Sequence, residues 1–73
     1  MRLSEFARAV ETEFGARGAV LVSDLALSEI GNRTAAEALD AGVPAREVWL
    51  ALCVETDVPP SRRHGAGLRE PRR

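Results

Sequence analysis

The first apolar stripe of the chain has the spacing of a helix. It consists of Leu3, Phe6, Val10 and Phe14. Steps of three and four positions place such residues on one face of an α-helix. Ser4 is a residue type favoured at the N-cap, and Gly15 is a type at which helices commonly end. The pattern therefore predicts a helix that starts at Ser4 and ends before Gly15.

The second apolar segment covers residues 19–30, after a short connection at residues 15–18. On a helical wheel its apolar residues cover nearly all directions, because Leu21 and Leu25 lie opposite the others. A helix that is apolar almost all round is usually central. Residues 19–22, "AVLV", could also form a strand, but the chain offers no second strand, and an isolated strand is not stable. We therefore expect a helix that ends at Gly31.

A capping box marks the start of the third predicted helix. In "TAAE" the Thr34 hydroxyl can accept from the backbone N–H of Glu37, whose carboxylate can reach back to the N–H of Thr34. Gly42 can adopt the left-handed conformation that closes a helix, so that Val43 folds back onto it. This predicts a helix of about two turns.

The fourth predicted helix runs from about Ala45 to Glu55, with Pro44 at its start, where a missing N–H is tolerated. It has two apolar sides. One side is formed by Ala45, Val48, Trp49, Leu52 and Cys53. Leu50 and Val54 lie nearly opposite, between Arg46 and Glu47. A surface helix of a monomer needs only one apolar side.

These elements predict an all-α fold. We expect a compact bundle of about four short helices in a domain of residues 1–58, followed by a flexible, disordered, arginine-rich tail at residues 59–73. The third and fourth helices have the spacing of a helix-turn-helix, with a small residue at Ala38, a turn at Gly42 and a branched residue at Val48. The same spacing is also an ordinary way to pack two short helices.

Composition argues against an enzyme and against a bound cofactor or metal. The chain has one cysteine and one histidine among 73 residues, so neither a disulfide nor a Cys/His metal site can form within it. Cys53 lies on the apolar side of a helix, and His64 lies in the expected tail, so neither has the setting of a catalytic group. No Gly-rich phosphate loop is present.

The same sequence indicates a cytoplasmic protein with no membrane segment. A single cysteine fits a reducing compartment. The residues after Met1 contain no apolar run of the length of a signal sequence or a membrane span.

Charge is distributed unevenly along the chain. Residues 1–58 contain five arginines and ten acidic residues, a formal charge of −5, and residues 59–73 contain five arginines and one glutamate, a charge of +4. An acidic body repels DNA, whereas a basic tail can hold phosphates without sequence specificity.

Five stretches carry a resemblance to a known family. They are "MRLSEF", the "FG" at residues 14–15, "GNRTAAEALDAGV", "VWLALC" and the "DVP" from Asp57. In order and spacing they resemble a family of short actinobacterial proteins, the domain of unknown function 3046. The resemblance covers roughly residues 1–60 and implies a small helical protein. It also implies a link with DNA metabolism, because genes of the family often lie near those for recombinase A and its regulator. The family has no established activity from which a site could be carried over.

The chain departs from that family at several positions. The family usually has an aromatic residue at Ala7, a histidine at Leu25, Asp-Pro in place of Pro44-Ala45, and polar residues at Leu50 and Val54. The last two differences make the outer side of the fourth helix apolar, which implies a contact that the relatives lack.

Two functions remain open. The first is a small non-enzymatic interaction protein that contacts an unknown partner protein, or a second copy of itself, through Leu50 and Val54 with Arg46 and Glu47 as a polar rim. On a simpler interpretation, the first helix or the tail covers both aliphatic residues. The alternative function is nucleic-acid binding, which is possible but not favoured. Its candidate contacts are Arg46, Arg62, Arg63, Arg69, Arg72 and Arg73.

Overall fold

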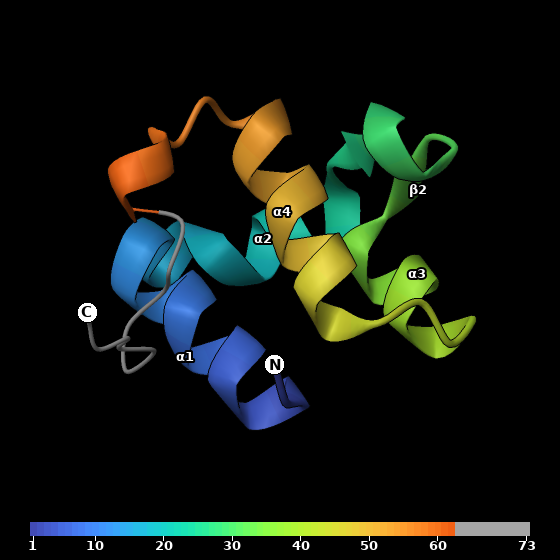
Figure 1. Ribbon diagram of the computed structural model, residues 1–73, viewed down its shortest axis with the longest axis horizontal. Coiled ribbons are helices and arrows are strands. Elements are labelled where there is room, and N and C mark those ends of the chain that lie inside the picture. Colours follow the sequence, from blue (N-terminus) through green and yellow to red (C-terminus); the bar gives the residue numbers. More distant parts are fainter. Residues whose placement is uncertain (63–73) are drawn as a thin grey trace.

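Helix α4, Ala45–Glu55, crosses the middle of the fold, and the other elements pack around it (Figure 1). The structure is a computed structural model that describes residues 1–62. Along the chain the other elements are α1 (Leu3–Phe14), η1 (Gly15–Arg17), α2 (Gly18–Asp24), β1 (Ala26–Leu27), η2 (Ser28–Ile30), β2 (Arg33–Thr34), α3 (Ala35–Asp40) and η3 (Pro60–Arg62), where η marks a 3-10 helix. The fold is thus mostly helical, with one small sheet.

Helix α4 has the bounds that the sequence predicted, and it supplies much of the core. Its buried residues are Ala45, Val48, Trp49, Ala51, Leu52 and Cys53. The Trp49 ring meets the rings of Phe6 and Phe14 edge-on, at centroid distances of 6.4 and 6.3 Å. Such aromatic pairs add to the stabilisation that burial provides. These contacts join the central helix to α1.

Helix α1 begins one residue earlier than the predicted N-cap, so the assignment of Ser4 as the cap was wrong. Ser4 lies inside the first turn, and the cap position is Arg2. Glu5 explains the shift, because its carboxylate accepts a hydrogen bond from the backbone N–H of Arg2 at 2.7 Å. This is the reach-back half of a capping box. The predicted stop at Gly15 is confirmed, with φ of +63° at that residue.

The prediction of one central helix over residues 19–30 was wrong. Helix α2 ends at Asp24, and the chain turns extended at Leu25, where φ is −82° and ψ is 119°. Helix α2 is not central either, because Val20 is 58% exposed. The apolar residues of this segment belong to different elements, since Leu21 lies in α2 and Leu27 in β1.

The expectation that no strands would form was also wrong, and the all-α assignment is corrected accordingly. Strands β1 and β2 pair antiparallel, with Ala26 opposite Thr34 and Leu27 opposite Arg33. The residues between them turn through two consecutive positive φ angles, +80° at Gly31 and +62° at Asn32. Glycine and asparagine tolerate this conformation best. The predicted stop at Gly31 therefore closes a hairpin loop and not an α-helix.

The capping box of α3 is confirmed. The Thr34 hydroxyl accepts from the N–H of Glu37 at 3.1 Å, and the Glu37 carboxylate accepts from the N–H of Thr34 at 2.9 Å. At the other end Gly42 has φ of +96°, and Val43 donates its N–H to the Ala38 carbonyl at 3.0 Å. This is the Schellman pattern that brings Val43 back onto the helix, as predicted. Local sequence therefore determines both ends of α3.

The chain beyond α4 remains folded as far as it is described. Val58 is buried and donates its N–H to the Cys53 carbonyl. Residues 59–62 fall in the segment expected to be a flexible tail, yet Pro60–Arg62 form the 3-10 helix η3, which lies beside α1 (Figure 1). The rest of the expected tail, residues 63–73, lies outside the described residues.

No helix within residues 1–62 combines the length and the apolar character needed to cross a membrane.

Candidate interaction surfaces

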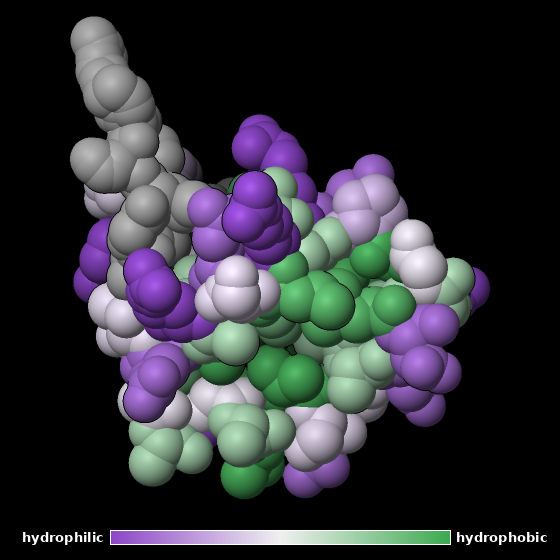
Figure 2. Space-filling model, turned by 90° about the horizontal axis from the view of Figure 1, so that it is seen from below, coloured by the Kyte–Doolittle hydropathy of each residue, from purple (hydrophilic) through white to green (hydrophobic). Residues whose placement is uncertain are grey.

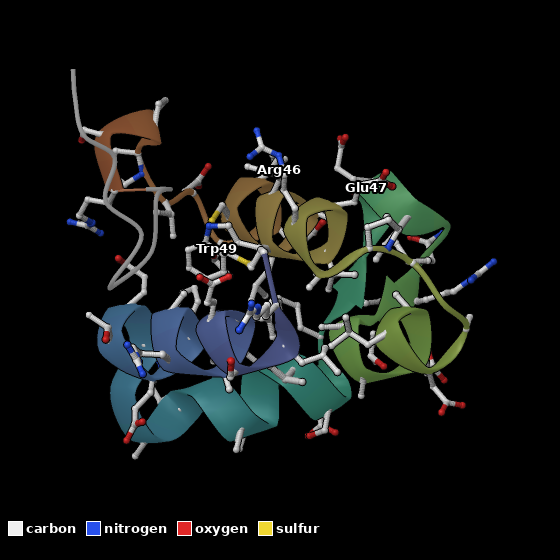
Figure 3. All side chains as sticks on the ribbon, turned by 60° about the horizontal axis from the view of Figure 1, so that its bottom comes forward. Arg46, Glu47 and Trp49 are labelled. Carbon is white, nitrogen blue, oxygen red and sulfur yellow. The ribbon has the colours of Figure 1, made fainter. Side chains whose placement is uncertain are left out.

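The outer side of α4 holds the four residues predicted to form a contact surface. Arg46 and Glu47 are exposed and point away from the body, whereas Trp49 points from α4 toward α1 (Figure 3). Val54 is 42% exposed. Leu50 is only half-exposed and packs against the core, so its predicted outward position is corrected. This surface consequently offers a single well-exposed aliphatic side chain, Val54, between two opposite charges.

A larger apolar surface lies on another face, where the sequence analysis placed no site. It is an open groove with a volume of about 610 Å³ between α1, α2 and α3. Figure 2 shows apolar side chains gathered in the middle of this face, with polar side chains around them. The groove is lined by Leu3, Phe6, Ala7, Val10, Glu11, Gly15, Ala16, Gly18, Ala19, Val22 and Leu39. We call it the α1–α2 groove.

Leu3 is the most exposed large apolar residue of the described chain, at 63%. The sequence analysis assigned it to the buried stripe of α1 together with Phe6 and Val10, which are indeed buried. Leu3 differs because it lies at the first turn of α1, at the end of the groove, where no neighbouring element covers it. Burying a leucine fully is worth about 1.5–3 kcal/mol, so an occupant that covers Leu3 gains a substantial contact.

Small residues create the groove. Gly18 is buried, and a Cβ atom at this position would lie 2.5 Å from Cγ1 of Val10, so α1 and α2 pack closely here. Beside this contact Ala7, Ala16 and Ala19 have side chains too short to fill the space between the helices. In the sequence, the available signal for the groove was a small residue, Ala7, beside the apolar stripe of α1. Such a residue indicates a groove only when it is known which helix packs beside it.

Charged residues of both signs lie along α1, and Glu11 is the one that reaches the groove. Glu11 is exposed. Glu13 lies one turn from Val10 and binds Arg62, with Nη2 of Arg62 2.8 Å from Oε2 of Glu13. Arg62, a candidate nucleic-acid contact, therefore has an intramolecular partner. The other tail candidates, Arg63, Arg69, Arg72 and Arg73, lie outside the described residues.

Glu55 connects the end of α4 to the hairpin loop. Its Oε1 atom accepts hydrogen bonds from the backbone N–H of Ser28 at 3.1 Å and from the Ser28 hydroxyl at 2.9 Å. These bonds, led by the one from the backbone, favour the charged carboxylate and lower the pKa of Glu55 below its usual value. The contact holds the hairpin loop against the end of α4.

Of the two residues considered as catalytic groups, Cys53 and His64, the structure describes Cys53. Cys53 is fully buried, as expected for a structural cysteine. Within residues 1–62, no three His, Cys, Asp or Glu side chains gather as metal ligands would. His64 lies beyond the described part of the chain. The described chemistry is thus that of an apolar groove with one acidic residue.

Comparison with known proteins identifies the family. Residues 1–61 match the model of a family described as a protein of unknown function (DUF3046). The chain belongs to this family. The match confirms the resemblance drawn from the five sequence stretches, and it includes every residue that lines the groove. No curated protein and no solved structure matches the chain. The family description names no activity, so function must be argued from the surfaces described above.

Proposed function

We propose that this protein is a small, non-enzymatic interaction module that binds a short apolar segment of a partner protein in the α1–α2 groove. The observation that carries the proposal is the uncovered apolar lining, with Leu3 63% exposed beside a groove of about 610 Å³. Concave, mostly apolar surfaces with a few polar groups are typical binding sites.

The shape of the groove favours a short segment over a flat protein surface. Its volume falls in the range of about 300–1,000 Å³ that is typical of sites for small ligands. A stable interface between two globular surfaces instead covers about 800 Å² on each partner. A helix or an extended segment can insert a few aliphatic side chains into such a groove. Glu11 adds a preference for a segment with an arginine or lysine beside its aliphatic anchor.

The groove supports the proposal better than the outer side of α4. Leu50 contributes to the core, so a partner at α4 would bury little more than Val54. Interfaces depend on a cluster of buried anchors surrounded by a polar rim. One aliphatic residue between Arg46 and Glu47 does not form such a cluster.

Selection from a phage-displayed library of random short peptides on the immobilised protein tests this function. We expect the selected peptides to carry an aliphatic residue next to an arginine or lysine. Affinity of one synthesised peptide is then measured for the wild type, Ala7→Trp and Val54→Trp. Ala7→Trp should fill the groove and weaken binding at least tenfold, whereas Val54→Trp should leave it unchanged. Equal affinity for wild type and Ala7→Trp, or failure to select any peptide, would refute the proposal.

Nucleic-acid binding is the weaker proposal. Affinity for DNA depends on neutralising phosphates, and residues 1–62 contain six arginines against ten acidic residues. Arg46 lies beside Glu47, and Arg62 pairs with Glu13. Fluorescence anisotropy with a labelled short duplex and a single strand at low salt distinguishes the two functions. Binding that falls steeply with salt and is lost in Arg46→Ala would favour DNA.

A further inference from the structure

The described chain ends beside the helix that forms one wall of the groove. Arg62 is the last described residue, and its guanidinium is held by Glu13 near the C-terminal end of α1. Eleven residues follow, with the sequence "RHGAGLREPRR". This segment, residues 63–73, therefore starts next to α1.

The segment is long enough to reach the groove. An extended chain advances about 3.3–3.6 Å per residue, so Leu68, six residues after Arg62, can lie up to about 20 Å away. Helix α1 has 12 residues. At 1.5 Å per residue it is about 18 Å long, and a helix with its side chains is about 10–12 Å thick. Leu68 can therefore pass around α1 and reach the apolar lining.

The segment also has the chemistry that the groove favours. Leu68 is its one large aliphatic residue, and Arg69 follows directly. Residues 63–73 contain four arginines and one glutamate, a formal charge of +3, whereas residues 1–62 carry −4. Opposite charges favour association of the two parts, and Glu11 in the lining can pair with Arg69.

We propose that residues 63–73 occupy the α1–α2 groove of their own chain, with Leu68 against the apolar lining and Arg69 beside Glu11. The inference rests on the proposed function for the existence of a binding groove. A tethered segment has an effective concentration on the order of millimolar, so even a weak contact is populated. A partner segment that binds the groove must therefore displace Leu68.

Methyl NMR spectra of the full-length protein test the proposal without any partner. We compare the wild type with Leu68→Ser and with the matched control Ala66→Ser, which makes the tail similarly polar but keeps the leucine. Leu68→Ser should shift the methyl signals of Leu3, Val22 and Leu39, while that of Val54 stays in place. Ala66→Ser should leave all four signals unchanged. Unaltered groove signals in Leu68→Ser, or shifts that depend on protein concentration and so indicate a second copy, would overturn the proposal.

Competition with the selected peptide separates this inference from the proposed function. If Leu68 occupies the groove, Leu68→Ser should bind the peptide several-fold more tightly than Ala66→Ser does. If Leu68→Ser and Ala66→Ser bind the peptide equally well, and the wild type also binds it, the contact between the tail and the groove is refuted but the groove function is not. A peptide that fails to bind either variant would refute the groove function itself.

Discussion

Glu55 shows how a single exposed side chain can fix the position of a loop. One of its oxygens accepts both the N–H and the hydroxyl of Ser28. Because the pKa of Glu55 is lowered in the folded state, its stabilising contribution is present above the ordinary pKa of a glutamate, about 4.3. It is lost as the pH falls through the lowered pKa. Melting temperatures should therefore be lower for Glu55→Gln than for the wild type at pH 7, and the two should converge in acid.

The control for this prediction is Glu47→Gln, which removes an exposed carboxylate from the same helix. It should leave the pH dependence of the melting temperature close to that of the wild type. A wild-type curve parallel to that of Glu55→Gln from pH 7 down to pH 3 would show that the Ser28 contact has no role in stability.

Residue-scale features were predictable where they are local. Thr34 and Glu37 are three positions apart, so their capping box could be recognised in the sequence. Ser28 and Glu55 are 27 positions apart, and their contact exists only because the hairpin loop packs against α4. The sequence carries no short-range signal for such a bond.

Gly18 determines how closely α1 and α2 can pack. A Cβ atom there would meet Cγ1 of Val10 at 2.5 Å and its carbonyl oxygen at 3.3 Å. Gly18→Ala should therefore force α1 and α2 apart and lower the free energy of unfolding by about 1–3 kcal/mol, the usual cost of overpacking. Urea denaturation followed by circular dichroism measures this loss.

A double-mutant cycle identifies the cause of that loss. If the clash with the Val10 methyl dominates, Gly18→Ala combined with Val10→Ala should be less destabilising than the sum of the two single changes. Strict additivity would mean that the clash with the Val10 methyl does not cause the loss of stability. Another cause would then be needed, because alanine is intrinsically more favourable than glycine in a helix.

Element-scale prediction succeeded for α1 and α4, where an apolar stripe marks the buried side, and for α3, where the capping box marks the start. It failed between Asp24 and Thr34, because strands of two residues are too short to show an alternating pattern. The consecutive Gly31 and Asn32 were the available sign of a hairpin. The groove could not be predicted either, since Ala7 and Ala19 leave space only when α1 and α2 lie side by side.

At the scale of the whole molecule, one core joins α1, β1, α3 and α4. Trp49 of α4 contacts α1 through Phe6 and Phe14. The fully buried Leu27 lies in β1, which packs against α4. In a domain of this size a single core rarely supplies more than about 3–5 kcal/mol, so no part has enough stability to remain folded alone. We expect all described elements to unfold together.

Leu27→Val tests this cooperativity because it perturbs the core far along the chain from the tryptophan that reports on it. Removing one methylene should lower the free energy of unfolding by about 1 kcal/mol. The midpoints from Trp49 fluorescence and from far-ultraviolet circular dichroism should shift equally and remain coincident, as a two-state transition requires. A dichroism midpoint that falls below the fluorescence midpoint would mean that the hairpin and its neighbours unfold before the contact between α1 and α4 is lost.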